Sequence, residues 1–351
     1  MENLVLTLDY ELYGDGSGDV FRHVIEPTRE LMRYFDDKGI KTTIFVEMVE
    51  FNRLDQEWHK GNQMGYDTNP FDAVAQQIQS IYRHGHDVQL HLHPQWVNAH
   101  YLNGKWLVDD DNWMLGNYDE VNGITLEQLI LSNMQSLERI IRQVDPAYRC
   151  VALRAGGYNV QPSERLVRAM KSTGMKLDSS IVPMAVQQGK HAQFDFTRCS
   201  PAMDYWHVDT SLEVASCGDA QLVELPLASM PVRRIQKLFS RARLKSILNN
   251  SASATASFQD KANSTGDNSL IGKIRYLFET EYVTWDFCLM GRNMHRRFLR
   301  TLKNRKMAVL VGHPKGFTSL ATIQSLLQVM PHDVEFITVS DFLAKNIDVS
   351  C

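Results

Sequence analysis

The sequence predicts an α/β protein built on a distorted or incomplete (β/α) barrel of about seven parallel strands. Apolar runs rich in β-branched residues alternate with amphipathic helical segments, and repeated β–α units of this kind form parallel sheets. Neither G-x-G-x-x-G nor G-x-x-x-x-G-K-S/T follows the first strand, which disfavours an open nucleotide-binding sheet. A length of 351 residues would allow two domains, but barrels of this size form one unit, and we expect residues 1–351 to be a single domain.

The first three strands and helices occupy residues 4–144. The run Leu-Val-Leu-Thr-Leu is a short apolar strand, and Lys-Thr-Thr-Ile-Phe-Val is rich in β-branched residues, which favour strands. The helical segments repeat apolar residues every three or four positions, and two of them stop at Gly39 and at His84-Gly85. The predicted elements, in chain order, are strand 4–8, helix 28–38, strand 41–46, helix 71–83, strand 87–91 and helix 125–144.

The remaining elements continue the alternation along the chain. Pro162 stands at the start of a helical segment, where proline is tolerated, and Gly174 stands just after its end. The predicted elements are strand 150–153, helix 162–172, strands 175–178, 221–225 and 307–311, helix 319–329, strand 335–339 and a helix from Asp341.

Two long segments interrupt this order. Residues 246–270 are dominated by Ser, Ala, Asn and Thr, and we expect a disordered loop there. Residues 98–123 form an insertion, and it presents aromatic side chains just after Trp96. These are Tyr101, Trp106, Trp113 and Tyr118. Such a loop either packs on the domain or offers ring faces to a ligand such as a sugar, and the sequence leaves both interpretations open.

Positive charge is concentrated in two stretches. The chain has 37 Lys and Arg against 41 Asp and Glu, yet residues 233–245 hold six basic residues and residues 292–306 hold seven, without an acid in either. Both predict basic amphipathic helices. They are either solvated helix faces or a surface for an anion, such as a sugar phosphate, a lipid-linked pyrophosphate or an anionic membrane. Nucleic acid is disfavoured, because the chain is acidic overall and carries no recognition motif.

The composition indicates the compartment. No stretch reaches the roughly 20 consecutive apolar residues of a membrane span, and the first nine residues lack the basic start of a signal peptide. The five cysteines are an odd number without C-x-x-C spacing, which is typical of a reducing compartment and argues against a sulfur-ligated zinc site. We expect a cytoplasmic protein.

Unusual polar residues follow five of the predicted strands. In a (β/α) barrel, catalytic groups come from the carboxyl ends of the strands and from the loops after them. The residues at these ends are Asp9 and Glu11, His91 and His93, Arg154 with residues 156–159, Asp178, and His313. Together they predict an active site at the mouth of the barrel.

Two of these strand ends carry a pair of polar residues separated by one position. Residues i and i+2 of an extended chain point to the same side, so Asp9 with Glu11, and His91 with His93, are each expected to converge. Two carboxylates and two imidazoles at one mouth suit a divalent ion, with zinc favoured and Co²⁺, Ni²⁺ or Mn²⁺ as alternatives.

In this order, the motifs resemble those of the polysaccharide deacetylases of carbohydrate esterase family 4, the NodB-homology fold. The matching segments are Thr7-Leu8-Asp9-Tyr10-Glu11, Gly85-His86-Asp87-Val88-Gln89-Leu90-His91, Arg154, Asp178-Ser179-Ser180 and Val311-Gly312-His313. The resemblance spans residues 3–343, and Val223-Glu224-Leu225-Pro226 also looks like a family strand. It implies a barrel of the deacetylase type that acts as a catalytic domain.

The resemblance implies a catalytic role for five residues. Asp9 would be the general base, with Arg154 keeping it charged and oriented and Asp178 in the supporting network. His313 would be the general acid, a task for which an imidazole with a pKa near the working pH is suited. Val311 would line the pocket for the acetyl methyl group.

The implied metal ligands depart from the family pattern. Glu11 would replace the family's second aspartate, although Tyr10 separates it from the first acid. His91 would be the first histidine ligand. The family's second histidine comes four residues later, where this chain has Gln95, so His93 must supply that ligand.

On the substrate side, the arginine motif lacks its proline and has its tyrosine one residue later. The backbone N–H of the oxyanion hole would therefore belong to Gly157 or Tyr158, and Trp96 would add an aromatic surface. The implied activity is hydrolytic removal of an N-acetyl, or O-acetyl, group from a sugar in a glycan or in a phosphate- or lipid-linked precursor.

Two alternatives to this activity stay open. One is hydrolysis of a non-sugar C–N amide bond on the same fold, and the other is a catalytically inactive glycan-binding homologue. The set of Asp9, Arg154 and His313 favours an enzyme, because a binding module needs no acid and base together. A Ser-His-Asp hydrolase is disfavoured, because no G-x-S-x-G elbow is present.

Overall fold

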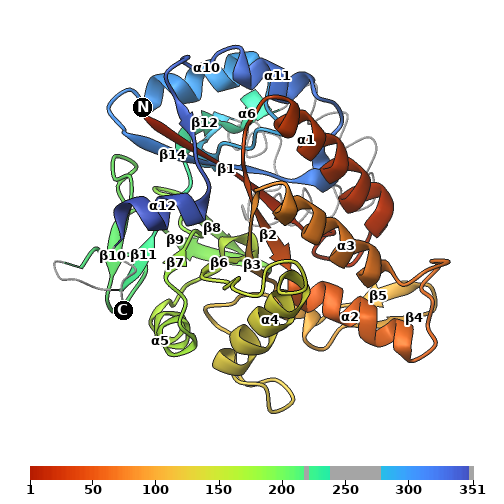
Figure 1. Ribbon diagram of the computed structural model, residues 1–351. Helices are drawn as coiled ribbons and strands as arrows, with labels where there is room; N and C mark the ends of the chain where they lie inside the picture. Colours follow the sequence, from red (N-terminus) through yellow and green to blue (C-terminus); the bar gives the residue numbers. More distant parts are fainter. Residues whose placement is uncertain (217–220, 238–277, 348–351) are drawn as a thin grey trace.

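The computed structural model describes residues 1–216, 221–237 and 278–347, and the loop expected at 246–270 lies outside them. One sheet forms the centre, in the order β10-β11-β7-β6-β3-β2-β1-β14, and β15 pairs with the start of β1 (Figure 1). The strands are β1 (Asn3–Tyr10), β2 (Thr43–Glu47), β3 (Asp87–Leu92), β6 (Ala152–Ala155), β7 (Leu177–Asp178), β10 (Trp206–Val208), β11 (Leu222–Glu224), β14 (Met307–Gly312) and β15 (Glu335–Phe336).

The seven strands from β11 to β14 run parallel, which confirms the predicted barrel. Each of the eight predicted strands is present, with ends shifted by a few residues. Apart from β15, which is partly exposed, they are short and almost wholly buried, as expected of parallel strands covered on both faces.

The barrel is incomplete between β14 and β11. Single bridges span the opening, Leu227 with Val309 and Asp286 with Val311, in place of a full strand. At the far edge, β10 runs antiparallel to β11, and the alternating pattern does not predict it. The opening matters for the site, because the segment that carries Asp286 enters the barrel there.

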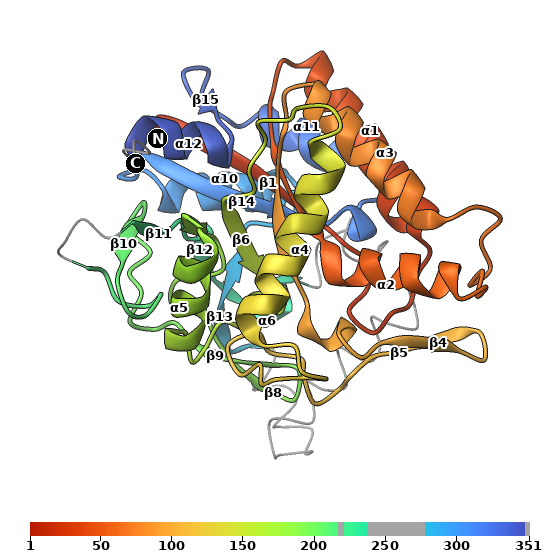
Figure 2. The same cartoon turned by 60° about the horizontal axis from the view of Figure 1, so that its bottom comes forward.

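Helices cover the outside of the sheet, and α1, α3 and α4 lie along one flank (Figure 2). The helices are α1 (Glu26–Asp37), α2 (Met48–His59), α3 (Pro70–Arg83), α4 (Leu126–Ile141), α5 (Glu164–Thr173), α6 (Arg234–Lys237), α10 (Arg292–Thr301), α11 (Ala321–Leu327) and α12 (Val339–Asn346). None of the helices within the described ranges combines the length and apolar character that crossing a bilayer requires.

Capping side chains explain where several helices begin and end. Thr125 and Gln128 form a capping box at the start of α4, and Gly174 ends α5 with a φ of 84°. The helix expected from Asp341 begins at Val339 instead, because Thr338 caps it, so the strand expected at 335–339 is limited to β15. The sequence pattern does not predict α2, which begins where Glu47 accepts hydrogen bonds from the Val49 and Glu50 amides.

Three two-stranded antiparallel sheets stand outside the main sheet in the described part of the chain. They are β4 (His100–Leu102) with β5 (Lys105–Leu107), β8 (Val186–Gly189) with β9 (Ala192–Asp195), and β12 (Ser229–Arg233) with β13 (Thr280–Thr284). The first belongs to the aromatic insertion at 98–123. Trp96, Trp106 and Tyr118 are buried there, whereas Tyr101 and Trp113 are partly exposed. Packing therefore accounts for most of these rings.

The second basic run forms α10 and the turn after it, as predicted. Its residues divide into two groups. Arg297 donates to Pro231 O at 2.8 Å and Arg305 to Asp204 Oδ1 at 2.9 Å, so both stabilise the fold, while Arg292, Arg296, Arg300, Lys303 and Lys306 are exposed. Of the first run, the structure describes residues 233–237, and residues 238–245 lie outside the described ranges.

Candidate metal centre and catalytic cluster

The carboxyl ends of neighbouring parallel strands bring the predicted site residues to one mouth of the barrel. Asp9 and Glu11 come from the end of β1, His91 and His93 from β3, Arg154 from β6, and His313 from the end of β14. The register sets Glu47 of β2 beside His91, and His91 beside Arg154. Because the strands are parallel, residues 60 and more positions apart in the chain meet here.

Three of the predicted metal ligands face one another. The ligand atoms of Glu11, His91 and His93 all lie within 4.8 Å of one another. Glu11 Oε2 is 3.4 Å from His91 Nε2 and 3.1 Å from His93 Nδ1. Both Glu11 Oε2 and His91 Nε2 are buried without a hydrogen-bond partner, which is rare for buried polar atoms. A divalent ion would satisfy both atoms, so these residues fit a zinc-like ion.

The electrostatic field at this group also favours a cation. Burial alone would raise the pKa of Glu11, but Lys315, His93 and His91 hold it well below its usual value. Burial alone would lower the pKa of His91, yet Asp9 and Glu11 raise it. Positive charge is therefore stabilised between these carboxylates. A second group with ligand atoms within 4.8 Å, made by Asp9, Glu11 and His313, shares Glu11 with the first.

Each histidine of the first group has an orienting partner. His91 Nδ1 lies 2.8 Å from Arg154 O, and His93 Nδ1 lies 2.9 Å from Glu47 Oε2. Glu47 is fully buried. A partner on the ring nitrogen opposite the ligand atom fixes the tautomer and orientation of a ligating imidazole, as Arg154 O does for His91. At His93 the same nitrogen, Nδ1, faces both Glu11 and Glu47. No sequence motif includes Glu47, although its place at the end of a predicted strand, like that of His91, is a signal that could have identified it.

Lys315 is a further residue that the motifs do not indicate. It lies in η4 (Pro314–Gly316), and its Nζ donates to Glu11 Oε1 at 2.7 Å and to Leu12 O at 2.8 Å. This contact occupies one oxygen of Glu11 and leaves the other facing the histidines.

Asp9 is held by a buried guanidinium. Arg154 Nη1 donates to Asp9 Oδ1 at 2.7 Å and to Thr7 Oγ1 at 2.8 Å, while its Nε donates to Ser179 O at 2.9 Å. Burial would raise the pKa of Asp9, but Arg154, His91 and His313 keep it well below its usual value. The carboxylate is therefore ionised and fixed in position.

His313 lies between two carboxylates. Its Nε2 is 3.4 Å from Asp9 Oδ2, and its Nδ1 is 2.9 Å from Asp286 Oδ2. Burial would lower the pKa of the imidazole, but Asp286 and Asp9 raise it to about 10. This differs from the near-neutral value expected from the sequence, because both ring nitrogens face a carboxylate. Asp286 lies in a segment without a motif, so no sequence signal identifies it.

Asp178 lies one layer away from this cluster and does not touch Asp9. It accepts from Ser180 N at 2.9 Å, and Ser180 Oγ in turn accepts from Ala155 N at 2.9 Å. Glu224, its partner in the β7–β11 register, accepts from Ile181 N at 3.1 Å. Asp178 thus supports the segment whose Ser179 O accepts a hydrogen bond from Arg154.

We expect Glu224→Gln to make the protein more stable at alkaline pH. Burial raises the pKa of Asp178 to about 6, and burial together with Asp178 raises the pKa of Glu224 well above its usual value. Both pKa values are higher in the folded chain than in the unfolded chain, so the folded state is favoured while the two carboxyl groups are protonated at low pH. This contribution to the free energy of unfolding is lost as pH rises through about 6. Gln removes one of the two charges, so the free energy of unfolding at pH 8 should rise by about 1–3 kcal/mol.

The measurement for Glu224→Gln is urea denaturation at pH 5 and pH 8. Glu335→Gln, a change at an exposed carboxylate paired with Lys345, is the control and should leave the pH dependence unchanged. An identical pH dependence in Glu224→Gln and the unmodified chain would contradict the expectation.

The loop after β6 continues into η3 (Gly156–Tyr158), where Gly156 packs against the His93 ring. Gly157 and Tyr158 both have left-handed backbones, with φ of 59° and 63°, so the chain turns sharply beside His93. Tyr158 is partly exposed and Val311 is fully buried. Trp96 differs from expectation: it is fully buried and packs edge-on against Trp106, with ring centres 5.1 Å apart. Its ring faces are covered by protein, so they are closed to a substrate.

Gly156→Ala is expected to displace His93. A Cβ at position 156 would lie 2.2 Å from His93 Cδ2 and 2.4 Å from Nε2, and an imidazole ring cannot bend away. Since His93 belongs to the proposed ion site, we expect metal affinity to fall about 10–100-fold, measured by competition with a chromophoric chelator. Gly189→Ala is the matched control, because its Cβ would meet nothing closer than 3.7 Å. Unchanged affinity in Gly156→Ala would contradict a ligand role for His93.

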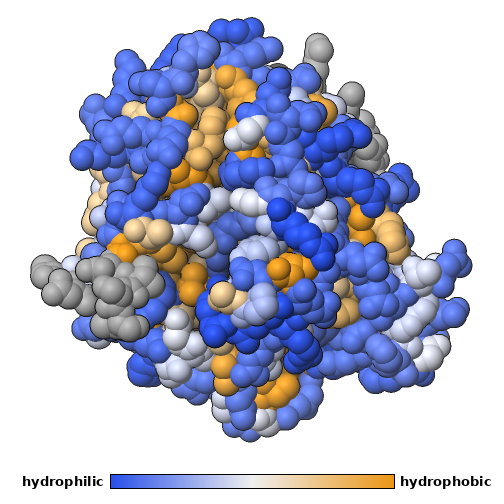
Figure 3. All heavy atoms as spheres, in the orientation of Figure 1, coloured by the Kyte–Doolittle hydropathy of each residue, from blue (hydrophilic) through white to orange (hydrophobic). Residues whose placement is uncertain are grey.

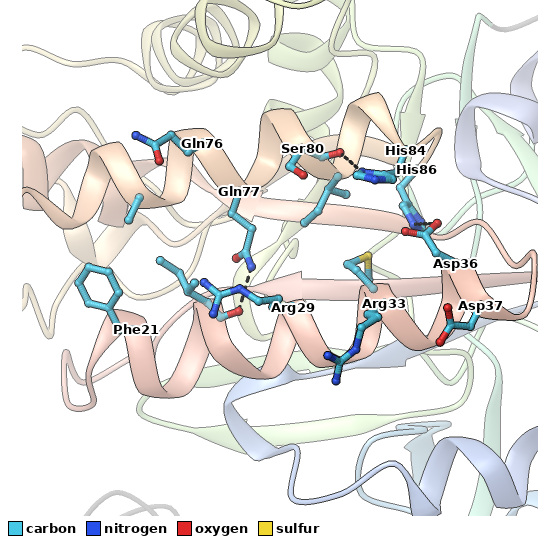
Figure 4. A pocket seen from close by; sticks show the side chains of 14 residues that line it. Phe21, Arg29, Arg33, Asp36, Asp37, Gln76, Gln77, Ser80, His84 and His86 are labelled. Carbon is cyan, nitrogen blue, oxygen red and sulfur yellow. Dashed lines mark hydrogen bonds and ion pairs between the residues drawn. The ribbon is translucent and has the colours of Figure 1, made fainter.

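A separate groove of about 540 Å³ lies between α1 and α3 (Figure 4). Arg29 and Arg33 line it from α1, and Gln76 and Ser80 line it from α3. None of the residues of the carboxylate–histidine cluster lines this groove. The cluster itself is largely buried and reaches solvent beside His313 and Lys315, whose side chains are 23% and 17% exposed.

Comparisons with known proteins concern the fold. No protein-family model and no curated protein matches the chain. A protein assigned as a polysaccharide deacetylase, from Mycobacterium smegmatis, is 13% identical over 97% of this chain and 90% of its own, with a TM-score of 0.45. Puue allantoinase is 11% identical over 98% and 91%, with a TM-score of 0.47. A mutant of a CE4 family pseudoenzyme with restored enzymatic activity is 10% identical over 97% and 67%, with a TM-score of 0.38.

At these sequence identities and TM-scores the likeness is limited to the path of the chain, and no activity of the three proteins is assigned to this chain on that basis. What the cluster can do follows from the chain's own residues.

Proposed function

We propose that the chain is a metal-dependent hydrolase that removes an acetyl group from the nitrogen, or the oxygen, of a sugar in a glycan or glycan precursor. One observation carries the proposal: the buried pair of Asp9 and Arg154 lies next to both an ion-ligand group and His313. A base, an acid and an ion site in one mouth suit the hydrolysis of an amide or ester.

In this proposal Asp9 takes the proton from the attacking water. Arg154 occupies Asp9 Oδ1, whereas Oδ2 faces His313 across 3.4 Å, so the second oxygen is the one available for the proton. Because Ser179 and Thr7 also hold Arg154, the carboxylate keeps its orientation while it acts as a base.

His313 then donates a proton to the departing amine. Its contact with Asp286 orients the ring, as a carboxylate does for a catalytic histidine elsewhere. The C–N bond breaks as the proton arrives, and acetate and the free amino sugar are released. The backbone N–H of Gly157 or Tyr158 stabilises the oxyanion, and Val311 lines the space for the methyl group.

The ion would be held by Glu11, His91 and His93, and would supply a Lewis acid for the acetyl carbonyl together with an acidified water. One carboxylate and two imidazoles are ligands that suit zinc, and Co²⁺, Ni²⁺ and Mn²⁺ accept the same donors.

The test is metal analysis of the purified chain, followed by a screen for acetate release from N- and O-acetylated sugars and from acetylated non-sugar amines. We expect one divalent ion per chain and release of acetate from an acetylated sugar. Release from the non-sugar amides alone would contradict the sugar substrate. Metal binding with no hydrolysis of any compound would contradict an enzymatic role and leave the glycan-binding alternative.

The exposed arginines on the outer face of α10 suggest where in the cell the protein binds its substrate. Arg292, Arg296 and Arg300 recur every fourth residue and are exposed, and no Asp or Glu occurs between residues 287 and 332. Hydrophilic residues line the top edge of Figure 3, where Figure 1 places α10, and hydrophobic residues show just below them. We propose peripheral contact of this face with an anionic membrane, where each arginine contributes about 1 kcal/mol. A phosphate- or lipid-linked precursor on the cytoplasmic side would fit this contact.

Sedimentation with vesicles tests the membrane contact. We expect binding to phosphatidylserine vesicles at low salt, loss of binding as salt rises, and a decrease in affinity of about 100-fold in Arg292→Gln/Arg296→Gln/Arg300→Gln. Vesicles of phosphatidylcholine are the control. Equal binding to both vesicle types, or equal binding by the variant, would remove this part of the proposal.

A further inference from the structure

The groove between α1 and α3 lies on the outside of the barrel, between two of the helices that cover the sheet (Figure 4). Its volume of about 540 Å³ is within the range of sites that hold small molecules. Figure 4 shows Phe21 at one end of the groove and Asp36 and His86 at the other. The proposed hydrolysis uses none of the residues that line it, so the groove needs an account of its own.

The two ends of the groove differ in how their charges are balanced. Arg29 and Arg33 stand one helical turn apart on α1, are exposed, and make no ion pair with any residue that the structure describes. Asp36, in contrast, accepts from Lys41 Nζ at 2.6 Å and lies 3.2 Å from His86 Nε2. The uncompensated charge of the lining is therefore positive, which favours an anionic ligand.

Gln77 is held in place beside Arg29. Figure 4 shows the Arg29 guanidinium turned toward the Gln77 carboxamide. Oε1 of Gln77 accepts from the hydroxyl of the fully buried Tyr10 at 2.7 Å, and Nε2 donates to Ile25 O at 2.9 Å. A carboxamide nitrogen carries two hydrogens, so Nε2 keeps one for a ligand. A donor fixed in this way binds a ligand with a smaller loss of conformational entropy.

An unusual backbone segment forms the same end of the groove. The π-helix η1 (Val20–Ile25) runs directly into α1 and supplies Phe21 and Ile25 to the lining. Its last carbonyl, Ile25 O, is the one that accepts from Gln77. π-Helices are rare and occur frequently at functional sites, so the backbone geometry gives an independent indication of a binding site where Arg29 and Gln77 meet.

The rest of the lining indicates the chemistry of the ligand. Ile25, Met32 and Ile81 are buried apolar side chains of the lining, and they suit an aliphatic body. Asp36 and Asp37 lie at the end opposite Phe21, where they would repel a second negative charge. A ligand with one negative charge and an apolar body therefore fits better than a phosphate dianion.

We propose that this groove is a binding site for a small aliphatic monocarboxylate. The carboxylate contacts Arg29 and Gln77, and the carbon chain packs on Ile25, Met32 and Ile81. The site is separate from the proposed active site and goes beyond the proposed hydrolysis.

Hexanoate is the probe, and the methyl signal of Met32 reports its binding. The chain is labelled with ¹³C at the methionine methyl groups, and Met32→Leu assigns the signal. We expect a saturable shift of this signal with a Kd of about 1 mM, and no shift of the signal from the fully buried Met170 in α5. Hexylammonium, which has the same carbon chain and the opposite charge, should bind at least about tenfold more weakly.

Arg29→Gln is the test variant, because it removes the charge and keeps a polar side chain of similar reach. Hexanoate affinity should fall at least about tenfold, as expected for the loss of a hydrogen bond to a charged group. Arg168→Gln, a change at an exposed arginine of α5, is the matched control and should leave the affinity unchanged. Thermal melting checks that each variant is folded.

Three results would overturn the inference. They are absence of a shift at Met32, equal hexanoate affinity in Arg29→Gln and the unmodified chain, and hexylammonium binding as tight as that of hexanoate. Tighter binding of hexyl phosphate than of hexanoate would overturn the assignment to a carboxylate.

Asp9→Asn and removal of the ion separate this inference from the proposed function. Both changes should leave the hexanoate affinity at Met32 unchanged, because the groove shares no residue with the mouth. Loss of the Met32 shift in Asp9→Asn would place the probe at the mouth and overturn the inference. Hexanoate binding that depends on Arg29, in a chain that releases no acetate from any sugar, would contradict the proposed hydrolysis and support the groove.

Discussion

Asp9→Asn is expected to lower the rate of acetate release by about 10²–10⁴-fold while the ion stays bound. Asn keeps the size of the side chain, and its oxygen can still accept the hydrogen bond from Arg154, which measures 2.7 Å in the present structure. It cannot take a proton from water. The ion stays because the proposed ligands are Glu11, His91 and His93. The measurement is a comparison of kcat with the metal content of the same preparation.

This variant also decides between the two possible ion sites. In the alternative group, Asp9 would itself be a ligand beside Glu11 and His313, and Asp9→Asn would then lose the ion. Asp87→Asn is the matched control, since Asp87 is a buried carboxylate at the opposite end of its strand, bonded to Thr43 and Ser340. We expect that change to affect stability and leave kcat unchanged. Full activity in Asp9→Asn would contradict its role as the base.

Removal of the ion is the second change with a large expected effect. A chelator should abolish hydrolysis, and added zinc should restore it. Among the described residues, Arg154, Lys315 and protonated histidines are the cations that balance the carboxylates at the mouth, and none of them can replace the ion. Since the ion binds only the folded chain, its loss should also lower stability by about 3–4 kcal/mol at ion concentrations of 100–1,000 times Kd. Thermal denaturation with and without chelator measures this difference.

Two neighbouring glutamates make the ion test specific. Glu11→Gln should lose the ion, since Oε2 of Glu11 is the atom that lacks a hydrogen-bond partner. Glu50→Gln is the matched control: burial, Glu47 and Glu11 raise the pKa of Glu50 well above its usual value, and Glu50 belongs to neither group of possible ion ligands. It accepts from Leu12 N at 3.2 Å, and Gln can do the same. Tight ion binding by Glu11→Gln would show that the ion lies elsewhere.

Much of the fold was predictable because it depends on neighbours along the chain. The apolar runs that become β1, β2 and β3 are local patterns, as are the glycine at 174 and the alternation of strand and helix. The convergence of Glu11 with His91 and His93 also follows from local rules, since strand ends of a parallel sheet share one edge. The short hairpins and β10 follow no such alternation, so the pattern does not predict them.

The amino-acid sequence by itself determined which strand ends carry acids, imidazoles and an arginine, because each of these features is read within a few residues. Only the tertiary structure decided which further residues contact these side chains. Glu47 reaches His93 through strand register, Asp286 reaches His313 through the opening in the barrel, and Lys315 turns back onto Glu11. The same holds for the raised pKa of His313 and the burial of Trp96. Coulomb interactions and packing depend on distances in space, and the spacing of residues along the chain does not contain them.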